Sequence, residues 1–276
     1  MIFNLYSQIE NGMVAHFQFN GNCQDILNSS IVSINNGVTF VDGRNSDVGG
    51  AADLSNEKHV TFNDDAVKAE LPLTISFWIN FNSFGYRNPI FYSDNVYDVY
   101  YGYTVTASSD GKIWLTITDG LGVGSTHRRS FNSNQSLSIG KWYHIVGVFR
   151  SASDMDLYID CVKAAGIYSG TGNAQIMYSS SDSKIGSRTG IAADPYDRYL
   201  NASVDQLVIW DRELSVNEIT YLCDTYNDLK VEEHFLQPKT LVKIVDVLGR
   251  ETEKKLNQVL FYIYSDGTSE KVFLIE

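Results

Sequence analysis

An aspartate stands inside a stretch that otherwise has the pattern of a buried β-strand. In "ASVDQLVIWDR", Val204, Leu207 and Ile209 are the apolar residues expected to face a core, and Asp205 lies among them. A buried carboxylate is costly unless it is ion-paired, hydrogen-bonded or bound to a metal. The sequence therefore predicts a partner for Asp205, and all three kinds of partner stay open at this point.

Two polar, tyrosine-rich stretches have the composition of a saccharide-binding site. "YSDNVYDVYYGYTV" holds five tyrosines among Asp and Asn, and "SRTGIAADPYDRYL" adds arginine and tyrosine in what reads as a long loop. Sugar sites combine aromatic faces for stacking with a few polar groups that fix orientation. The predicted ligand-binding residues are Tyr97, Tyr101, Tyr103, Arg188 and Tyr196. The alternative is that most of these tyrosines belong to the core or to strand surfaces.

Catalytic patterns are weak in this chain, and we predict that it is not an enzyme. Glycoside hydrolysis uses two carboxyl groups about 5–9 Å apart. The nearest approach is "DMDLYID", which contains Asp154, Asp156 and Asp160, and the first two of these fall at a hairpin turn. No G-x-S-x-G, H-E-x-x-H or P-loop pattern occurs. His144, inside the strand pattern "KWYHIVGVF", is expected to be structural.

The charge and hydropathy of the chain limit its partners. Its 276 residues include 21 Lys and Arg against 33 Asp and Glu, a net charge of −12 at pH 7. This balance argues against nucleic acid, whose phosphates need basic residues. It suits a soluble acidic surface or carboxylates that bind Ca²⁺. No apolar run reaches the ~18 residues of a transmembrane helix, so no membrane insertion is expected.

The three cysteines, Cys23, Cys161 and Cys223, fit no zinc-binding spacing. Cys161 lies in the strand-like "LYIDCV", and we expect a buried thiol there, as is usual for free cysteine. A single disulfide is the alternative that stays open, since an odd number excludes complete pairing.

Many short strand patterns, with turn residues every ~8–12 positions, predict an all-β fold of two antiparallel sheets, a sandwich or jelly roll. The strongest are "LTISFWINF" and the pair "GKWYHIVGVFR" and "MDLYIDCVKAA", which reads as a hairpin. A short helix is predicted near 215–226. There Ser215 and Glu218 form a capping-box pattern before apolar residues at helical spacing.

The sequence divides into four predicted segments: a lead over 1–10, the jelly-roll domain over 11–228, a charged linker over 229–238, and a small β tail over 239–276. In the tail, an Asp-Gly pair between two strand patterns predicts a hairpin. The tail is too short for a robust core of its own. We expect it to dock on the main domain or to act as a tag.

Six stretches in order resemble the laminin-G-like, concanavalin A-like jelly-roll domains of bacterial surface and secreted proteins. They are "NGMVAHFQFNGNCQD", "LTISFWINF", "GKWYHIVGVFR", "LYIDCVKAA", "SKIGS" and "ASVDQLVIWDRELSVNEI". The resemblance implies a jelly roll over about 11–226. One departure is that Cys161 stands where the family pattern "YIDG" has glycine, so the turn after that strand is expected to differ.

The same resemblance implies a structural calcium ion. In such domains the aspartate of the last core strand and the N-terminal "NGNAND" loop lie close together. The corresponding ligands here are Asp25 and Asp205, with oxygens of Asn20 and Asn22. Ca²⁺ takes 6–8 oxygen ligands, and a loop rich in Asn, Asp and Gly can supply them. The alternative is that Asp205 accepts hydrogen bonds from backbone amides and needs no metal.

The last stretch resembles the sorting tails of proteins exported by the type IX secretion system of Bacteroidota. "VDVLGRE" and "FYIYSDGTSEKVFLIE" carry that resemblance, which implies a secreted or cell-surface protein. The first 20 residues lack the basic start, apolar stretch and cleavage site of a signal peptide. Either such a peptide has been removed or the protein leaves its cell by another route.

The function expected from these observations is non-catalytic recognition of glycans or glycoproteins, or adhesion, outside the producing cell and with a structural calcium. The first alternative is a structural or interaction protein, such as a phage capsid-decoration or fibre component, which would be located in the virion. The second is a divergent glycoside hydrolase. An oligomer or larger assembly is open in each case. Fold resemblance alone suits all three, because one fold hosts many functions.

Overall fold

The computed structural model describes residues 8–27, 31–63, 65–94, 96, 98–172, 175–188, 199–228, 241–265 and 269–273. The chain forms two compact units, Met1–Asp228 and Leu229–Glu276. The first unit contains the two large sheets and the helix, and the second contains a small third sheet. Among the described residues no helix is long and apolar enough to cross a membrane.

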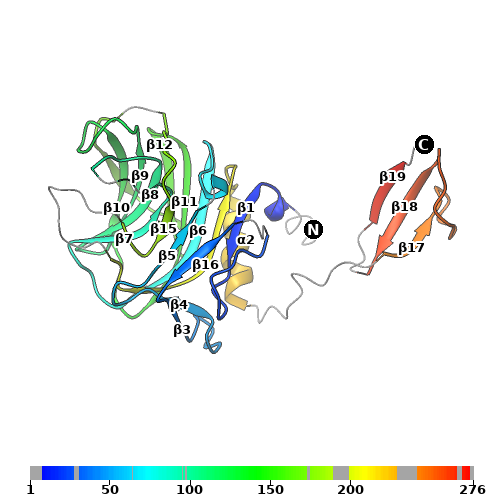
Figure 1. Ribbon diagram of the computed structural model, residues 1–276, viewed down its shortest axis with the longest axis horizontal. Coiled ribbons are helices and arrows are strands. Elements are labelled where there is room, and N and C mark those ends of the chain that lie inside the picture. Colours follow the sequence, from blue (N-terminus) through cyan, green and yellow to red (C-terminus); the bar gives the residue numbers. More distant parts are fainter. Residues whose placement is uncertain are drawn as a thin grey trace. The chain divides into compact units, whose positions relative to one another are not determined.

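The first unit consists of two eight-stranded antiparallel sheets that lie face to face (Figure 1). Strand order in the first sheet is β13 (Val162–Lys163), β12 (Asp154–Ile159), β11 (Trp142–Ser151), β6 (Leu73–Phe81), β16 (Ala202–Trp210), β4 (Ala51–Asp53) and β3 (Thr39–Val41), and β1 (Met13–Phe17) also pairs with β16. Strand order in the second sheet is β14 (Gly166–Ser169), β10 (Arg128–Ser136), β9 (Lys112–Thr118), β8 (Tyr103–Ser108), β7 (Arg87–Tyr92), β15 (Ser183–Ile185), β5 (His59–Phe62) and β2 (Ser33–Asn36). A short 3-10 helix, η1, spans Asp65–Val67. The predicted two-sheet, all-β sandwich is confirmed.

Strand alternation explains how the core between the sheets forms. Along β6, the residues Leu73, Ile75, Phe77, Ile79 and Phe81 are fully buried in this core. Successive strand side chains point to opposite faces. The side chains between them therefore lie on the outer face of the first sheet, away from the second sheet. The same alternation in the other strands identifies which of their side chains face outward in both sheets.

Helix α2 (Val216–Asp228) covers part of that outer face. It begins with the predicted capping box: the Glu218 amide donates to Ser215 Oγ at 3.3 Å, and the Ser215 amide donates to Glu218 Oε2 at 2.7 Å. Ile219 and Leu222 belong to an apolar cluster with Val208 and Trp210 of β16. The predicted helix is confirmed, and its buried side holds it on the first sheet.

A disulfide joins Cys161, in the turn after β12, to Cys223 of α2. The expectation of a free thiol at Cys161 is therefore wrong. The two-residue turn between β12 and β13 is formed by Asp160 and Cys161, both with positive φ (48° and 68°). This backbone conformation favours glycine, and the cysteine side chain there reaches the helix. Cys23 is a buried free thiol.

The second unit is a three-stranded antiparallel sheet in the order β17 (Leu241–Val245), β18 (Val259–Tyr264) and β19 (Ser269–Phe273). After β17, the Asp246 carboxylate accepts hydrogen bonds from the amides of Leu248 and Arg250 and from the Arg250 guanidinium. These bonds shape the "DVLGR" turn. The predicted small β tail is confirmed, while its Asp-Gly turn lies outside the described residues.

Candidate functional site

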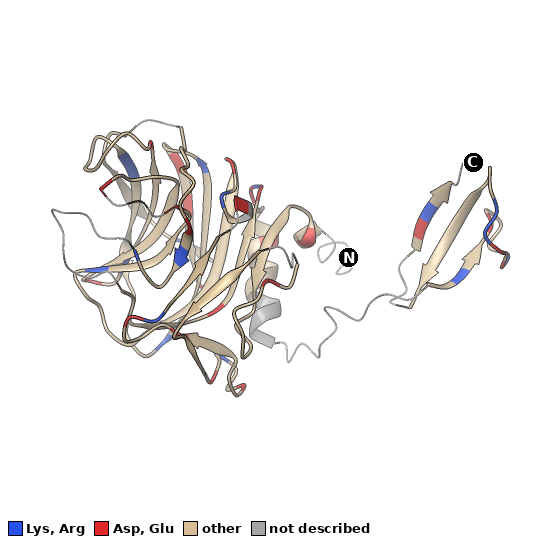
Figure 2. Ribbon diagram, viewed as in Figure 1, with Lys and Arg blue, Asp and Glu red and all other residues tan. Residues whose placement is uncertain are grey.

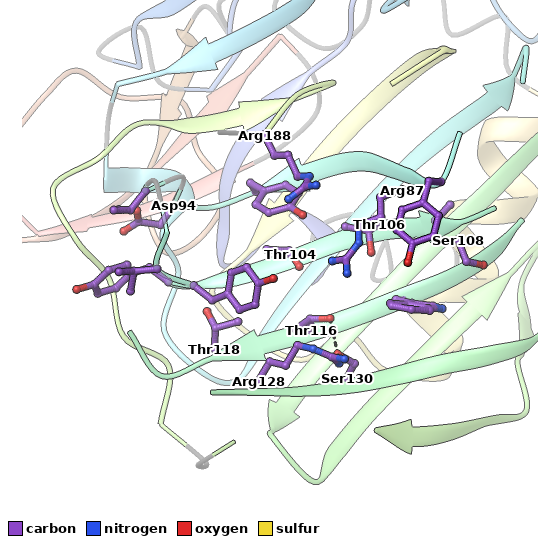
Figure 3. A pocket seen from close by; sticks show the side chains of 18 of the residues that line it. Arg87, Asp94, Thr104, Thr106, Ser108, Thr116, Thr118, Arg128, Ser130 and Arg188 are labelled. Atoms are coloured by element: carbon purple, nitrogen blue, oxygen red, sulfur yellow. Dashed lines mark hydrogen bonds between the residues drawn. The ribbon is translucent and has the colours of Figure 1, made fainter. Parts of the chain in front are cut away.

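A cavity of about 220 Å³ lies on the outer face of the second sheet, the face turned away from the core (Figure 3). In β8 the side chains of Tyr103, Val105 and Ala107 are buried in the core, which leaves the alternate positions for the outer face. Strands β8, β9 and β10 thereby supply a floor of hydroxyl groups. These groups belong to Thr104, Thr106, Thr116, Thr118 and Ser130.

Aromatic side chains form much of the cavity wall. They belong to Tyr86, Tyr92, Tyr100, Tyr101 and Trp114. Tyr101 packs against Gly120, where an added Cβ would lie 2.5 Å from Cε1 of the ring. Gly120 also has φ of 69°, so a side chain there would be strained as well as in collision. Glycine at 120 therefore lets the Tyr101 ring lie where it does. Faces of this kind can stack on sugar rings while hydroxyl groups orient them.

Three arginines complete the wall: Arg87 in β7, Arg128 in β10, and Arg188 in the segment after β15. Arg128 Nη1 donates to Ser130 Oγ at 2.8 Å and to Ser169 Oγ at 3.4 Å. Ser130 Oγ also lies 2.8 Å from Thr116 Oγ1. A chain of neutral hydroxyl groups therefore sets the position of the Arg128 guanidinium without cancelling its charge.

One carboxylate, Asp94, also lines the cavity, but it is bonded to a neighbouring loop. It accepts hydrogen bonds from the Ser179 amide and from Ser179 Oγ, the latter at 2.8 Å. Asp94 is only 2% exposed. Its main part in the structure is to hold the loop around residue 179 against the segment that follows β7.

The predicted ligand residues fall into three groups. Tyr101 and Arg188 line the cavity, and contact with a ligand stays a prediction for both. Tyr103 does not line it: the side chain is fully buried, and its hydroxyl donates to the Val67 carbonyl at 3.0 Å. That prediction is corrected, because a ring with no exposed surface cannot stack on a sugar. Tyr97 and Tyr196 lie outside the described residues.

Several wall residues were missed by the sequence reasoning, most clearly Trp114 and Arg128. A local signal for Trp114 was present in "KIWLTIT". Its isoleucines and leucine alternate with Trp114, Thr116 and Thr118, which places these three on one face. The sequence contained no comparable signal for Arg128. The next residue, Arg129, is also an arginine, so residue type does not distinguish the two positions.

The partner of Asp205 is Arg44, which forms an ion pair with Asp205 Oδ2. A bulge at Gln206, where φ is 52°, interrupts the pairing of β16 with β6. It lets Val204 and Leu207 both enter the core while Asp205, at 1% exposed, lies opposite Trp78. Burial raises the pKa of Asp205 to about 7, although the positive charge of Arg44 acts to lower it.

The proposed calcium ligands have protein partners in this structure. Asp25 Oδ1 accepts from the amides of His16 at 2.7 Å and Leu27 at 3.3 Å. Asn22 Oδ1 accepts from the Gln24 amide, and its Nδ2 donates to the Asn20 carbonyl at 3.3 Å. No group of three or more His, Cys, Asp or Glu positioned for a metal occurs in the described part of the chain. Asp205 Oδ1, however, is buried without a hydrogen bond. The fit to calcium is therefore partial, and the ion stays a prediction.

The carboxylates considered for catalysis are held by ion pairs and turn contacts. Arg150 pairs with Asp154 at 3.0 Å and with Asp156 at 3.1 Å, and Lys163 pairs with Asp156 at 2.7 Å. Although burial raises it, the pKa of Asp156 is lowered overall by Lys163 and Arg150. A carboxyl group of lowered pKa is poorly suited to be the general acid of glycoside hydrolysis.

His144 is buried between the first sheet and α2. Its Nε2 lies 2.7 Å from Ser76 Oγ and its Nδ1 lies 3.1 Å from Cys223 Sγ. Burial lowers the pKa of His144 to about 3, so the ring is neutral at physiological pH. These contacts give it a structural position, remote from solvent.

A family model of the laminin G type, described as the concanavalin A-like lectin/glucanases superfamily, matches residues 54–220. The chain belongs to this superfamily, as its two-sheet fold also indicates. No curated protein matches the chain in sequence.

Solved structures with this fold include several binding domains. Domain 4 of AbnA, an extracellular arabinanase from Geobacillus stearothermophilus in complex with arabinotriose, is 15% identical, with a TM-score of 0.54 over 76% of this chain and 98% of that domain. The binding domain of Paraclostridial Mosquitocidal Protein 1 is 17% identical, with a TM-score of 0.61 over 94% of this chain and 65% of that one. The binding domain of Botulinum Neurotoxin DC in complex with SialylT is 14% identical, with a TM-score of 0.52 over 95% of this chain and 74% of that one. At these identities the similarity concerns the fold.

Proposed function

We propose that the first unit is a non-catalytic carbohydrate-binding module that recognises glycans or glycoproteins outside the producing cell. The observation that carries this is the cavity of the second sheet, where aromatic faces, hydroxyl groups and guanidinium groups surround one space. Similar folds solved with arabinotriose and SialylT support it. The disulfide supports an oxidising, extracellular location.

The binding test uses Trp114, whose half-buried side chain forms part of the cavity wall. We expect W114A to weaken saccharide binding at least about tenfold, or about 1.4 kcal/mol, because stacking area is lost. Isothermal titration with a panel of neutral and acidic oligosaccharides measures this. The matched control is W142A, which removes a half-buried tryptophan from β11 of the other sheet. Equal loss of affinity in both variants, or in neither, would contradict the assignment of the cavity.

Calcium is a second part of the proposal, supported by the unbonded Oδ1 of Asp205. A ligand that binds only the folded state at ~100 times its dissociation constant adds about 2.7 kcal/mol. We therefore expect Ca²⁺ to raise the melting temperature of EDTA-treated protein by several degrees, and D25N to abolish the rise. An unchanged melting temperature, with no calcium found by metal analysis, would remove calcium from the proposal.

A further inference from the structure

The described residues that line the cavity carry a net charge opposite to that of the whole chain. Among the described residues that line it, three arginines face one aspartate, a formal balance of 3 − 1 = +2. The whole chain has 21 basic and 33 acidic residues, or −12. Figure 2 shows acidic residues spread over many strands and loops. A guanidinium group that no carboxylate neutralises favours an anion in its neighbourhood.

Arg128 is the arginine whose contacts are best defined. Both of its hydrogen bonds use Nη1, and both acceptors are serine hydroxyl groups. None of the ion pairs within the described residues involves it. Its charge is therefore positioned by neutral groups, with Nη2 left for an acceptor that enters the cavity. A guanidinium group binds carboxylate or sulfate oxygens through a planar fork of N–H donors.

A second arginine strengthens the preference for an anion. Burial lowers the pKa of Arg128, and the charge of Arg87 lowers it further, while Tyr100 acts in the opposite direction. Arg87 and Arg128 both line the cavity, at the beginnings of β7 and β10 (Figure 3). Two like charges that repel one another are stabilised when a negative group lies between or beside them.

We propose that the saccharide bound in this cavity is acidic, and that Arg128 binds its carboxylate or sulfate group while Trp114 and Tyr101 contact the sugar ring. The proposal rests on the proposed carbohydrate-binding function and adds the ligand class. Arg87 contributes to the positive field. The hydroxyl floor of β8 and β9 receives the uncharged hydroxyl groups of the sugar.

Three saccharides with one common core test the ligand class: lactose, 3′-sialyllactose and 3′-sulfolactose. By isothermal titration we expect at least one acidic saccharide to bind at least about tenfold more tightly than lactose. A comparison of the two acidic saccharides distinguishes carboxylate from sulfate as the recognised group. The advantage over lactose should shrink as NaCl rises from 0.05 to 0.5 M, since salt screens charges that solvent can reach.

Two neighbouring arginines supply the variant and its control. R128Q should remove the preference for the acidic saccharide over lactose, through a loss of about 10- to 100-fold in the affinity for the acidic saccharide. R129Q removes the same charge from the adjacent position of β10, where the side chain donates to the Gly170 carbonyl and lies over Tyr168. It should leave the preference unchanged. R128K, which keeps the charge without the planar fork, should retain part of it.

The outcomes separate the two proposals. If lactose and both acidic saccharides bind equally and W114A abolishes all three, the carbohydrate-binding function stands and the acidic class is wrong. If R129Q acts as strongly as R128Q, the preference reflects overall charge, and the role of Arg128 is overturned. If neither acidic saccharide binds at millimolar concentration, the acidic class is wrong for this cavity. If no member of the oligosaccharide panel binds either, the carbohydrate-binding function fails as well.

Discussion

Replacing Arg44 by methionine should destabilise the first unit by about 3–5 kcal/mol at pH 8, the usual cost of leaving one partner of a buried ion pair alone. The side chains of Arg44 and Asp205 are 9% and 2% exposed. Arg44 also lies 5.0 Å from the centre of the Trp78 ring, so its loss removes packing as well as charge. Urea unfolding followed by tryptophan fluorescence measures the change. All four tryptophans belong to the first unit, so the signal reports on that unit alone.

The destabilisation by R44M should depend on pH in a defined direction. The pKa of Asp205 is about 7 in the folded protein against an ordinary value of 3.8, and removal of the Arg44 charge raises it further. A group whose pKa is raised by folding contributes stability below its unfolded pKa, and that contribution is lost as pH rises through the folded value. The penalty in R44M should therefore be smaller at pH 5 than at pH 8.

A double-mutant cycle separates the pair from its surroundings. D205N keeps the shape of the side chain and removes its charge, so D205N leaves Arg44 as the unpaired group. In the double variant R44M/D205N neither charge remains, and we expect it to be more stable at pH 8 than R44M alone. A penalty for R44M that is equal at pH 5 and pH 8 would show that packing against Trp78, not charge, accounts for it.

Local pattern carried most of the fold prediction. Alternation in "LTISFWINF" defines which side of β6 enters the core, and the Ser215–Glu218 capping box marks the beginning of α2. Both signals arise between residues that are close in sequence, where backbone geometry fixes the spacing of side chains. The jelly roll itself was indicated by the resemblance of six stretches, in order, to laminin-G-like domains.

Long-range pairings were beyond the same reasoning. Arg44 and Asp205 are 161 positions apart, and no periodicity links them. The sequence required a partner for Asp205 without naming it. The cavity also combines predicted and unpredicted residues. Tyr101 and Arg188 were predicted as ligand-binding residues, and both line the cavity. Arg128 was not predicted, because its position depends on hydrogen bonds to serines of two different strands, Ser130 and Ser169. The prediction that Tyr103 binds a ligand was wrong for a local reason: β8 begins at Tyr103, and the side chain there is directed into the core.

Loss of the disulfide is the other change expected to have a large effect. It closes a loop between residues 62 positions apart, and C161S should cost the first unit about 2–4 kcal/mol, since the unfolded chain gains freedom when the link is removed. Thermal unfolding with and without reductant measures the same loss in the unaltered protein. A reductant should therefore lower its melting temperature by several degrees and leave that of C161S unchanged.

The turn that carries Cys161 offers a sharper comparison. Cys161 has φ of 68°, a conformation that costs a side chain about 1–2 kcal/mol and glycine almost nothing. C161S and C161G both remove the disulfide, but only C161G relieves the backbone, so C161G should be the more stable of the two by about 1 kcal/mol. Equal stability of the two variants would mean that the turn is not held in this conformation once the link is gone. A C161G variant more stable than C161S would show that the turn itself favours glycine, and an unaltered protein more stable than both would show that the link to α2 outweighs this local strain.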